Sequence, residues 1–246
     1  MRASGVLRAV LSLIVAVQVL PANGEIVIDR TRIIYAAAAS GVTVNLHNEA
    51  DGPRLVQVWI DEGDPQAPPE LSDVPFTVTP PILKLEAGKA KALRVVYHAA
   101  QRPAMTPSQE SVYWLNVLGI RPSAETNNHL QFAFRTRIKL FLRPAGLPGR
   151  VEDAVQALQW RLDNDKPVLL VRNPGAYHVT LSSIVLLHEG SEYRSEDPPM
   201  LLPQTAVAIA MPGRETPWQG PATLRFTTLD DHGTTREHGV ALSPMR

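Results

Sequence analysis

The sequence predicts an all-β protein with two sandwich domains in series. Short segments that alternate apolar and polar residues recur along the chain, and a period of two is typical of half-buried strands. Turn signals rich in Pro and Gly separate these segments at intervals of about 8–12 residues. A run at 143–150, RPAGLPGR, then divides the strands into two groups.

The first group contains seven predicted strands within about 120 residues, which is typical of an immunoglobulin-like sandwich. No amphipathic helix of useful length interrupts them. The Pro-rich stretch at 61–73 is predicted to be a loop. In chain order the strands occupy residues 25–35, 42–48, 55–62, 75–85, 91–98, 111–120 and 130–143.

The last strand of this group, with the sequence LQFAFRTRIKLFLR, is unusually long. Its even positions are apolar except Thr136, and its odd positions include Arg135, Arg137, Lys139 and Arg143. Strands commonly run about 5–6 residues, whereas these 14 residues would extend about 45 Å at roughly 3.3 Å each. Two interpretations remain open: a long core strand with a solvated basic face, or a strand that packs partly against something outside its own domain.

The second group follows the linker and predicts a smaller β-domain. Residues 151–157 are expected to form one helical turn before its first strand. The domain boundaries are therefore placed at 25–143, 144–150 for the linker, and 151–246. The predicted strands of the second domain are 158–163, 167–173, 178–188, 201–212 and 222–230.

The first 24 residues are predicted to be a cleaved signal peptide. Arg2 and Arg8 form a basic region, and a 12-residue apolar stretch from Ala9 to Leu20 follows. That stretch is too short to span a bilayer, which takes about 20 residues. Small residues before Glu25 provide a cleavage site. The mature protein, with 22 basic and 24 acidic residues, is expected to be soluble, exported and free of stable membrane insertion.

Composition excludes several kinds of function. The full chain has 24 basic and 24 acidic residues, so nothing indicates a nucleic-acid-binding surface. Cysteine is absent, which removes disulfides, a thiol nucleophile and cysteine metal sites. No nucleophile–base set or nucleotide-binding motif occurs. The sequence therefore predicts a protein that is not an enzyme and needs no cofactor.

Two clusters of polar residues are weak candidates for sites. His232, Glu237 and His238 lie near the C-terminus but lack the spacing of a known metal motif. The acidic cluster at 61–64 lies in the Pro-rich loop, where a solvated loop tip is more common than a catalytic pair.

Several motifs, in order, resemble the periplasmic pilus (fimbrial) assembly chaperones. The short loop at 121–129, the short arm before Arg32 and the missing cysteines are similar to the short-loop branch of that family. Weaker similarities in the second half are RNPGAY at 172–177 and TLDDHG at 228–233. The main motifs are DRTRIIY at 29–35, VQVWIDE at 56–62, a TPP-containing stretch at 76–94, QESVYWLNV at 109–117 and LQFAFRTRIKLFLRP at 130–144.

The resemblance implies two sandwiches set at an angle, with a cleft that binds unfinished pilus subunits before their delivery to an outer-membrane usher. Arg32 and Lys139 match the family's paired cleft cations, which hold the subunit's C-terminal carboxylate. Leu130, Phe132 and Phe134 match donor-strand residues, which fill a subunit groove by β-strand addition.

The resemblance also implies an ion-pair group between the domains, matched here by Glu110, Arg143 and Asp231. For these three residues the structural and functional interpretations coincide, since they would set the domain orientation. Physical chemistry supports the cleft separately. Two cations that converge on one carboxylate form charge-assisted hydrogen bonds, which are stronger than neutral ones.

The leading alternative is an exported adhesive or structural sandwich protein, such as a pilus subunit or a carbohydrate-binding module. A subunit would contain one incomplete sandwich and an N-terminal donor arm, whereas this sequence predicts two complete domains. An exported hydrolase is a third option, but it lacks a catalytic set.

Overall fold

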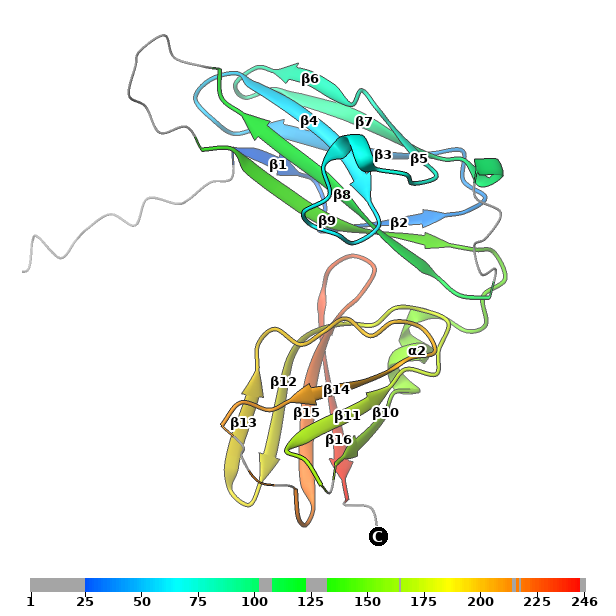
Figure 1. Cartoon of the computed structure of the whole chain (residues 1–246), viewed down its shortest axis with the longest axis vertical. Coiled ribbons are helices and arrows are strands. Elements are labelled where there is room, and N and C mark those ends of the chain that lie inside the picture. The colour runs from blue at the N-terminus through cyan, green and yellow to red at the C-terminus, as the bar shows by residue number, and fades with distance from the viewer. Residues whose placement is uncertain are drawn as a thin grey trace, which may run out of the picture.

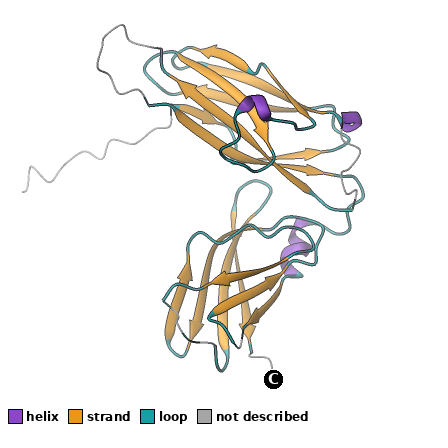
Figure 2. Ribbon diagram, viewed as in Figure 1, coloured by secondary structure: helices purple, strands orange, loops and turns teal. Residues whose placement is uncertain are grey.

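The computed structural model describes residues 25–101, 108–122, 132–163, 165–213, 216 and 218–243, and it contains two β-sandwich domains (Figure 1). Strands dominate both domains, and helix is confined to short segments (Figure 2). Within the described ranges, no helix is long and apolar enough to span a bilayer. The signal-peptide prediction concerns residues that lie outside this description.

The N-terminal sandwich consists of a four-stranded and a five-stranded sheet packed face to face. The first has the order β1-β3-β7-β5, and the second has the order β2-β9-β8-β4-β6. The strands of the first are β1 (Ile26–Ile28), β3 (Val42–Asn48), β7 (Ala90–Tyr97) and β5 (Phe76–Thr79). Those of the second are β2 (Arg32–Ala36), β9 (Phe134–Arg143), β8 (Ser111–Ile120), β4 (Arg54–Asp61) and β6 (Ile82–Leu85).

Two segments predicted as single strands each divide into two strands that belong to opposite sheets. Residues 25–35 form β1, which pairs with β3, and then β2, which pairs with β9. Residues 75–85 form β5 and β6, separated by Pro80 and Pro81. Proline has no N–H to donate to a strand ladder, so the two prolines end one pairing and let the chain cross to the other sheet.

Apolar side chains from both sheets fill the core between them. Tyr35 and Tyr113 from one sheet meet Phe76 and Tyr97 from the other, with ring centroids 5.0–6.2 Å apart. The edge-on contacts among them suit the charge distribution of aromatic rings. The hydroxyl of Tyr35 also accepts a hydrogen bond from the backbone N–H of Tyr97 at 3.0 Å, which ties the two sheets together.

Strand β9 is shorter than predicted, and its two faces are not simply one buried apolar face and one solvated basic face. It runs for 10 residues and begins at Phe134 rather than Leu130, which lies outside the described residues. Ile138, Leu140 and Leu142 enter the core as expected. On the opposite face, Phe141 is only 3% exposed, because this end of the strand is covered by the second domain.

The C-terminal sandwich pairs a three-stranded sheet, β10-β11-β14, with a four-stranded sheet, β13-β12-β15-β16. One helix, α2 (Val151–Gln156), precedes it, as the sequence predicted. The three-stranded sheet comprises β10 (Gln159–Leu162), β11 (Val168–Arg172) and β14 (Ala206–Ala210). The four-stranded sheet comprises β12 (Thr180–His188), β13 (Ser191–Ser195), β15 (Ala222–Leu229) and β16 (Thr235–Leu242).

Two of these strands, β13 and β16, were not predicted from the sequence. They form the two edges of their sheet, and their sequences, SEYRS and TREHGVAL, show little apolar alternation. The hairpin between β15 and β16 extends toward the N-terminal domain, which places its loop at the boundary between the sandwiches (Figure 1).

Candidate functional site

The two predicted cleft cations are neighbours on adjacent strands. β2 pairs with β9 in parallel, and in that register Arg32 lies opposite Lys139. Paired residues of neighbouring strands project from the same face of a sheet. Both side chains therefore emerge on the outer face of the five-stranded sheet, where the two domains meet.

Arg32 is almost completely enclosed and only partly satisfied. It is 9% exposed, and its Nη1 donates to the carbonyl oxygen of Leu229 in the C-terminal domain at 3.2 Å. The guanidinium also lies 5.9 Å from the ring centre of Phe141. Its Nε is buried without a hydrogen-bond partner among the described residues. The site thus contains a hydrogen-bond donor, Nε of Arg32, that no described residue uses, in a place from which water is largely excluded.

Burial acts on both cations, and the charge of Arg32 acts on Lys139. Burial lowers the pKa of Arg32, although the carboxylates of Asp231, Asp230 and Glu110 oppose this change. Burial also lowers the pKa of Lys139, with a further decrease from the charge of Arg32, and the carboxylate of Asp197 opposes this change.

Within the described part of the chain, neither cation has an acidic partner at ion-pair distance. Like charges placed side by side on a sheet are destabilising, and an anion bound between them would relieve the repulsion. Arg32, but not Lys139, is among the described residues that line a cavity between the domains. The cavity has a volume of about 520 Å³ and is lined from the N-terminal side by Arg32 and Ile34 and from the C-terminal side by Asp231 and His232.

The predicted interdomain group is brought together in the structure. Arg143, at the end of β9, donates to Glu110 at 2.9 Å and to both oxygens of Asp231 at 2.8 and 3.0 Å. Burial alone would lower the pKa of Arg143, but the two carboxylates reverse that effect and raise the pKa. Its guanidinium also lies over the ring of Tyr177 at 5.1 Å. The arginine thereby joins both domains through charged and aromatic contacts.

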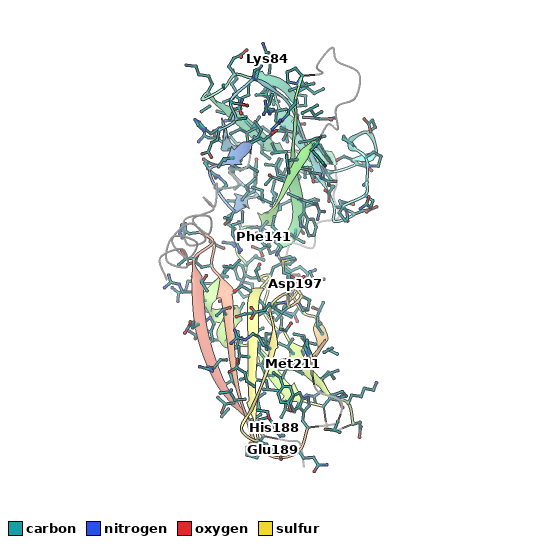
Figure 3. The ribbon with its side chains drawn as sticks, turned by 90° about the vertical axis from the view of Figure 1, so that its left-hand side faces the viewer. Lys84, Phe141, His188, Glu189, Asp197 and Met211 are labelled. Atoms are coloured by element: carbon teal, nitrogen blue, oxygen red, sulfur yellow. The ribbon has the colours of Figure 1, made fainter. Side chains whose placement is uncertain are left out.

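The sequence did not identify His178, which extends this network. Glu110 accepts a hydrogen bond from the backbone N–H of His178 at 2.9 Å and contacts the ring Nδ1 at 3.0 Å. The histidine ring packs on Phe141 with centroids 5.5 Å apart. A single histidine without a motif gave no signal in the sequence, because its partners come from the other domain. Figure 3 shows Phe141 where the two domains meet.

Apolar residues at and just before the start of β9 are exposed, and the outer edge of this part of the strand has no described strand neighbour. Phe132 and Phe134 are 62% and 60% exposed, whereas Leu130 lies outside the described residues. β2 pairs with β9 only from Lys139 to Arg143, so residues 134–138 have a described strand neighbour, β8, on one side alone. An open edge with large apolar side chains is the arrangement that accepts an added strand.

The acidic cluster forms the predicted solvated tip only in part: Glu62 and Asp64 are exposed, but Asp61 is not. Asp61 is 3% exposed and is paired with Arg137 across the outer face of the five-stranded sheet. The possible metal group near the C-terminus is also not assembled. Nowhere in the described ranges do three potential ligands gather around one point, and His238 instead contacts the hydroxyl of Thr228 at 2.9 Å.

The geometry defines a class: a protein of two immunoglobulin-like sandwiches, with two neighbouring cations where the domains meet and a strand with exposed apolar residues that leads to them. Two family models match the chain. The model for pili and flagellar-assembly chaperones, PapD N-terminal domain, matches residues 25–148. The model for pili assembly chaperone PapD, C-terminal domain, matches residues 153–239.

Individual relatives agree with these models. The chaperone protein FimB/FhaD of Bordetella pertussis is 35% identical over 228 residues, which cover 90% of each chain. The probable fimbrial chaperone YadV of Escherichia coli is 37% identical over 225 residues, covering 89% of this chain and 90% of YadV. A crystal structure of YadV chaperone superimposes with a TM-score of 0.78, covering 89% of this chain and all of that one.

The chain therefore belongs to the PapD-like family of pilus assembly chaperones. The family predicted from the motifs and the two-sandwich fold predicted from the strands are both confirmed.

Proposed function

We propose that this chain is a periplasmic chaperone that binds pilus or fimbrial subunits and completes their fold by donating part of β9. The observation that carries the proposal is the position of the Arg32–Lys139 pair at the end of the open edge. A subunit strand would pair along residues 134–138, and its terminal carboxylate would lie between the two cations. Leu130, Phe132 and Phe134 would fill a groove in the subunit.

The same geometry supports one direction for the added strand. The chain of β9 runs from Phe134 toward Lys139, and the cations lie at the Lys139 end. A subunit strand that ends at the cations and passes beside Phe134 must therefore run parallel to β9. It would continue the line of β2, which already pairs with β9 in parallel.

The interdomain group would hold the cleft at a constant width. We assign this role to Glu110, Arg143 and Asp231, because the arginine links the last strand of one domain to the β15–β16 loop of the other. The boundaries that fit this division are 25–143 for the first domain, 144–150 for the linker and 151–246 for the second. The proposed function requires no catalytic step and no cofactor.

Localisation and delivery complete the proposal. The basic and apolar order of residues 1–24 supports export through a cleaved signal peptide, with Glu25 as the first mature residue. A chaperone that holds subunits in the periplasm must pass them to an assembly platform, and we assign that role to an outer-membrane usher.

Affinity capture from a periplasmic extract tests the proposal. A tagged chaperone should retain fimbrial subunits, identified by mass spectrometry, whereas Lys139→Ala should retain much less of them. Arg172→Ala, at an exposed arginine of β11 in the other domain, serves as the matched control and should bind normally. Equal recovery with all three proteins, or no subunit with any of them, would contradict the proposal.

A further inference from the structure

The open end of β9 lacks support from its own apolar face. Phe134 is 60% exposed, and its register partner on β8 is Gly119, which has no side chain. Thr136, the next residue on that face, is also exposed. Packing on this face therefore does not determine whether residues 134–136 stay extended in the free protein.

Strong contacts to this segment occur on the opposite face. Nε and Nη2 of Arg135 donate to the side-chain oxygen of Asn116 at 2.8 and 2.6 Å. Its Nη1 donates to the carbonyl oxygen of Pro65 at 2.7 Å. The guanidinium lies over Trp59 at 4.9 Å from the ring centre. One side chain thus connects β9 to β8, to β4 and to the loop after β4.

Arg137 makes the equivalent contacts one pleat further along the strand. It pairs with Asp61, whose side chain is 3% exposed, and lies over Trp114 at 4.6 Å from the ring centre. Burial raises the pKa of Asp61, but hydrogen bonds from Arg137, Asn116 and the N–H of Gly63 lower it below its usual value. The buried carboxylate is therefore charged and fully engaged, as a buried charge must be.

Glycine at position 63 allows the loop to close over this cluster. Gly63 has a φ of +128°, and a Cβ there would lie 3.1 Å from the ring of Trp114. The loop thereby brings the carbonyl of Pro65 within reach of Arg135. Together, Arg135, Arg137, Trp59, Trp114 and Asp61 form what we call the arginine–tryptophan clasp.

We propose that Arg135 and Arg137 are positioning residues, which hold the open edge of β9 extended before a subunit arrives. The inference rests on the proposed donor role of this strand. Neither arginine would touch the groove-filling side chains, because both project from the other face. Their effect would be to order residues 134–136 during folding, so that less conformational entropy is lost when the subunit strand pairs.

Hydrogen exchange in the free protein tests the proposal. In Arg135→Gln, backbone amides in peptides covering residues 134–138 should exchange at least about 10-fold faster, because local opening there becomes easier. Peptides from β3 and β7 should keep their protection. The matched control is Arg225→Gln, at an exposed arginine of β15 in the other domain, and it should leave exchange at 134–138 unchanged.

A conservative substitution separates the hydrogen bonds and stacking of the planar guanidinium from its positive charge. Arg135→Lys keeps the charge but loses the planar fork and much of the stacking, so it should restore little of the protection. Unchanged exchange at 134–138 in Arg135→Gln, or full protection in Arg135→Lys, would overturn the proposal. If Arg135→Gln loses hydrogen-exchange protection throughout the domain, the result for Arg135→Lys alone decides whether the proposal holds.

The measurement is made without a subunit, so its outcome is independent of the proposed function. Failure to capture subunits would leave the exchange result intact, and unchanged exchange would leave the capture result intact.

Discussion

Arg143 donates two hydrogen bonds to Asp231 across the boundary between the domains, at 2.8 and 3.0 Å. The contact connects the last residue of β9, the strand that carries the cleft lysine, to the loop between β15 and β16. Substitution of Arg143 would therefore change the orientation of the two sandwiches relative to each other more than the fold of either one.

Arg143→Ala should loosen the domain arrangement and lower stability. Glu110, whose side chain is 2% exposed, would lose its cationic partner, and breaking a buried pair in this way costs about 3–5 kcal/mol. Small-angle scattering should show a broader distribution of domain angles, and calorimetry should show separate unfolding of the domains. Arg150→Ala, at a largely exposed arginine, is the control. A scattering profile identical to that of the unsubstituted protein would remove the proposed role.

Gly233→Ala should disturb the same boundary through a steric effect. Gly233 has a φ of +80°, and a Cβ there would overlap the hydroxyl of Thr31 in the N-terminal domain. Gly220→Ala is a matched control, because Gly220 has a φ of +78° but a Cβ at that position would have no described atom within 4 Å. Backbone strain should be similar in the two variants. A larger decrease of the melting temperature in Gly233→Ala would therefore report the steric overlap with Thr31 at the domain boundary. Equal losses would show that the contact is unimportant.

Arg32→Ala and Lys139→Ala should each leave a folded protein that no longer captures subunits. Loss of one partner from a largely desolvated charge contact costs about 2–5 kcal/mol, which corresponds to roughly a 30- to 5,000-fold change in affinity. Binding can be measured by titration with a peptide that ends in a free carboxylate and with its C-terminal amide. Normal affinity in both variants would show that the cations do not bind the chain end.

The pH dependence of stability should reveal the environment of Lys139. Its pKa is lowered in the folded state, so at alkaline pH the unfolded chain binds more protons there than the folded chain. Stability from this residue should therefore rise with pH between the lowered pKa and the ordinary value of about 10.4. The expected measurement is a smaller alkaline gain in the Lys139→Met variant than in the unsubstituted protein. Identical pH profiles for both would contradict the lowered pKa.

Phe132→Asp and Phe134→Asp should leave the melting temperature nearly unchanged but abolish protection of subunits from aggregation. Both side chains are about 60% exposed in the free protein, so little packing would be lost. Three buried apolar side chains, Leu130 included, would contribute roughly 5–9 kcal/mol to the complex as an upper estimate. In contrast, Leu140→Ala, at a fully buried position, should cost about 2–5 kcal/mol of stability. A large stability loss in the phenylalanine variants would identify them as core residues.

The alternation of apolar and polar residues located the strands whose inner face is buried. It did not locate the strands in which this alternation is weak. β13 and β16 were missed because they are edge strands with polar sequences, and an exposed edge favours polar residues. The change of sheet between β1 and β2 was also not visible in the sequence, because both parts of that segment contribute Ile side chains to the same core.

The site was less accessible to sequence reasoning than the fold. Arg32 and Lys139 were assigned through the family motif, whereas their contact depends on a parallel pairing between distant segments. The roles of Phe141 and Asp61 were missed for the same reason. Each is enclosed by groups from elements far away in the sequence, and periodicity describes only the strand that carries the residue.

The hydrogen bond between Arg32 and the carbonyl of Leu229 has a consequence for truncated forms of the protein. Both cleft cations belong to the N-terminal sandwich, yet the wall that shields Arg32 from water comes partly from the C-terminal one. An isolated N-terminal half would present the same two charges to bulk solvent, where attraction for a carboxylate is screened. In the proposed function, recognition of a chain end would therefore depend on the assembled pair of domains, although both of the cations that would bind it belong to the first.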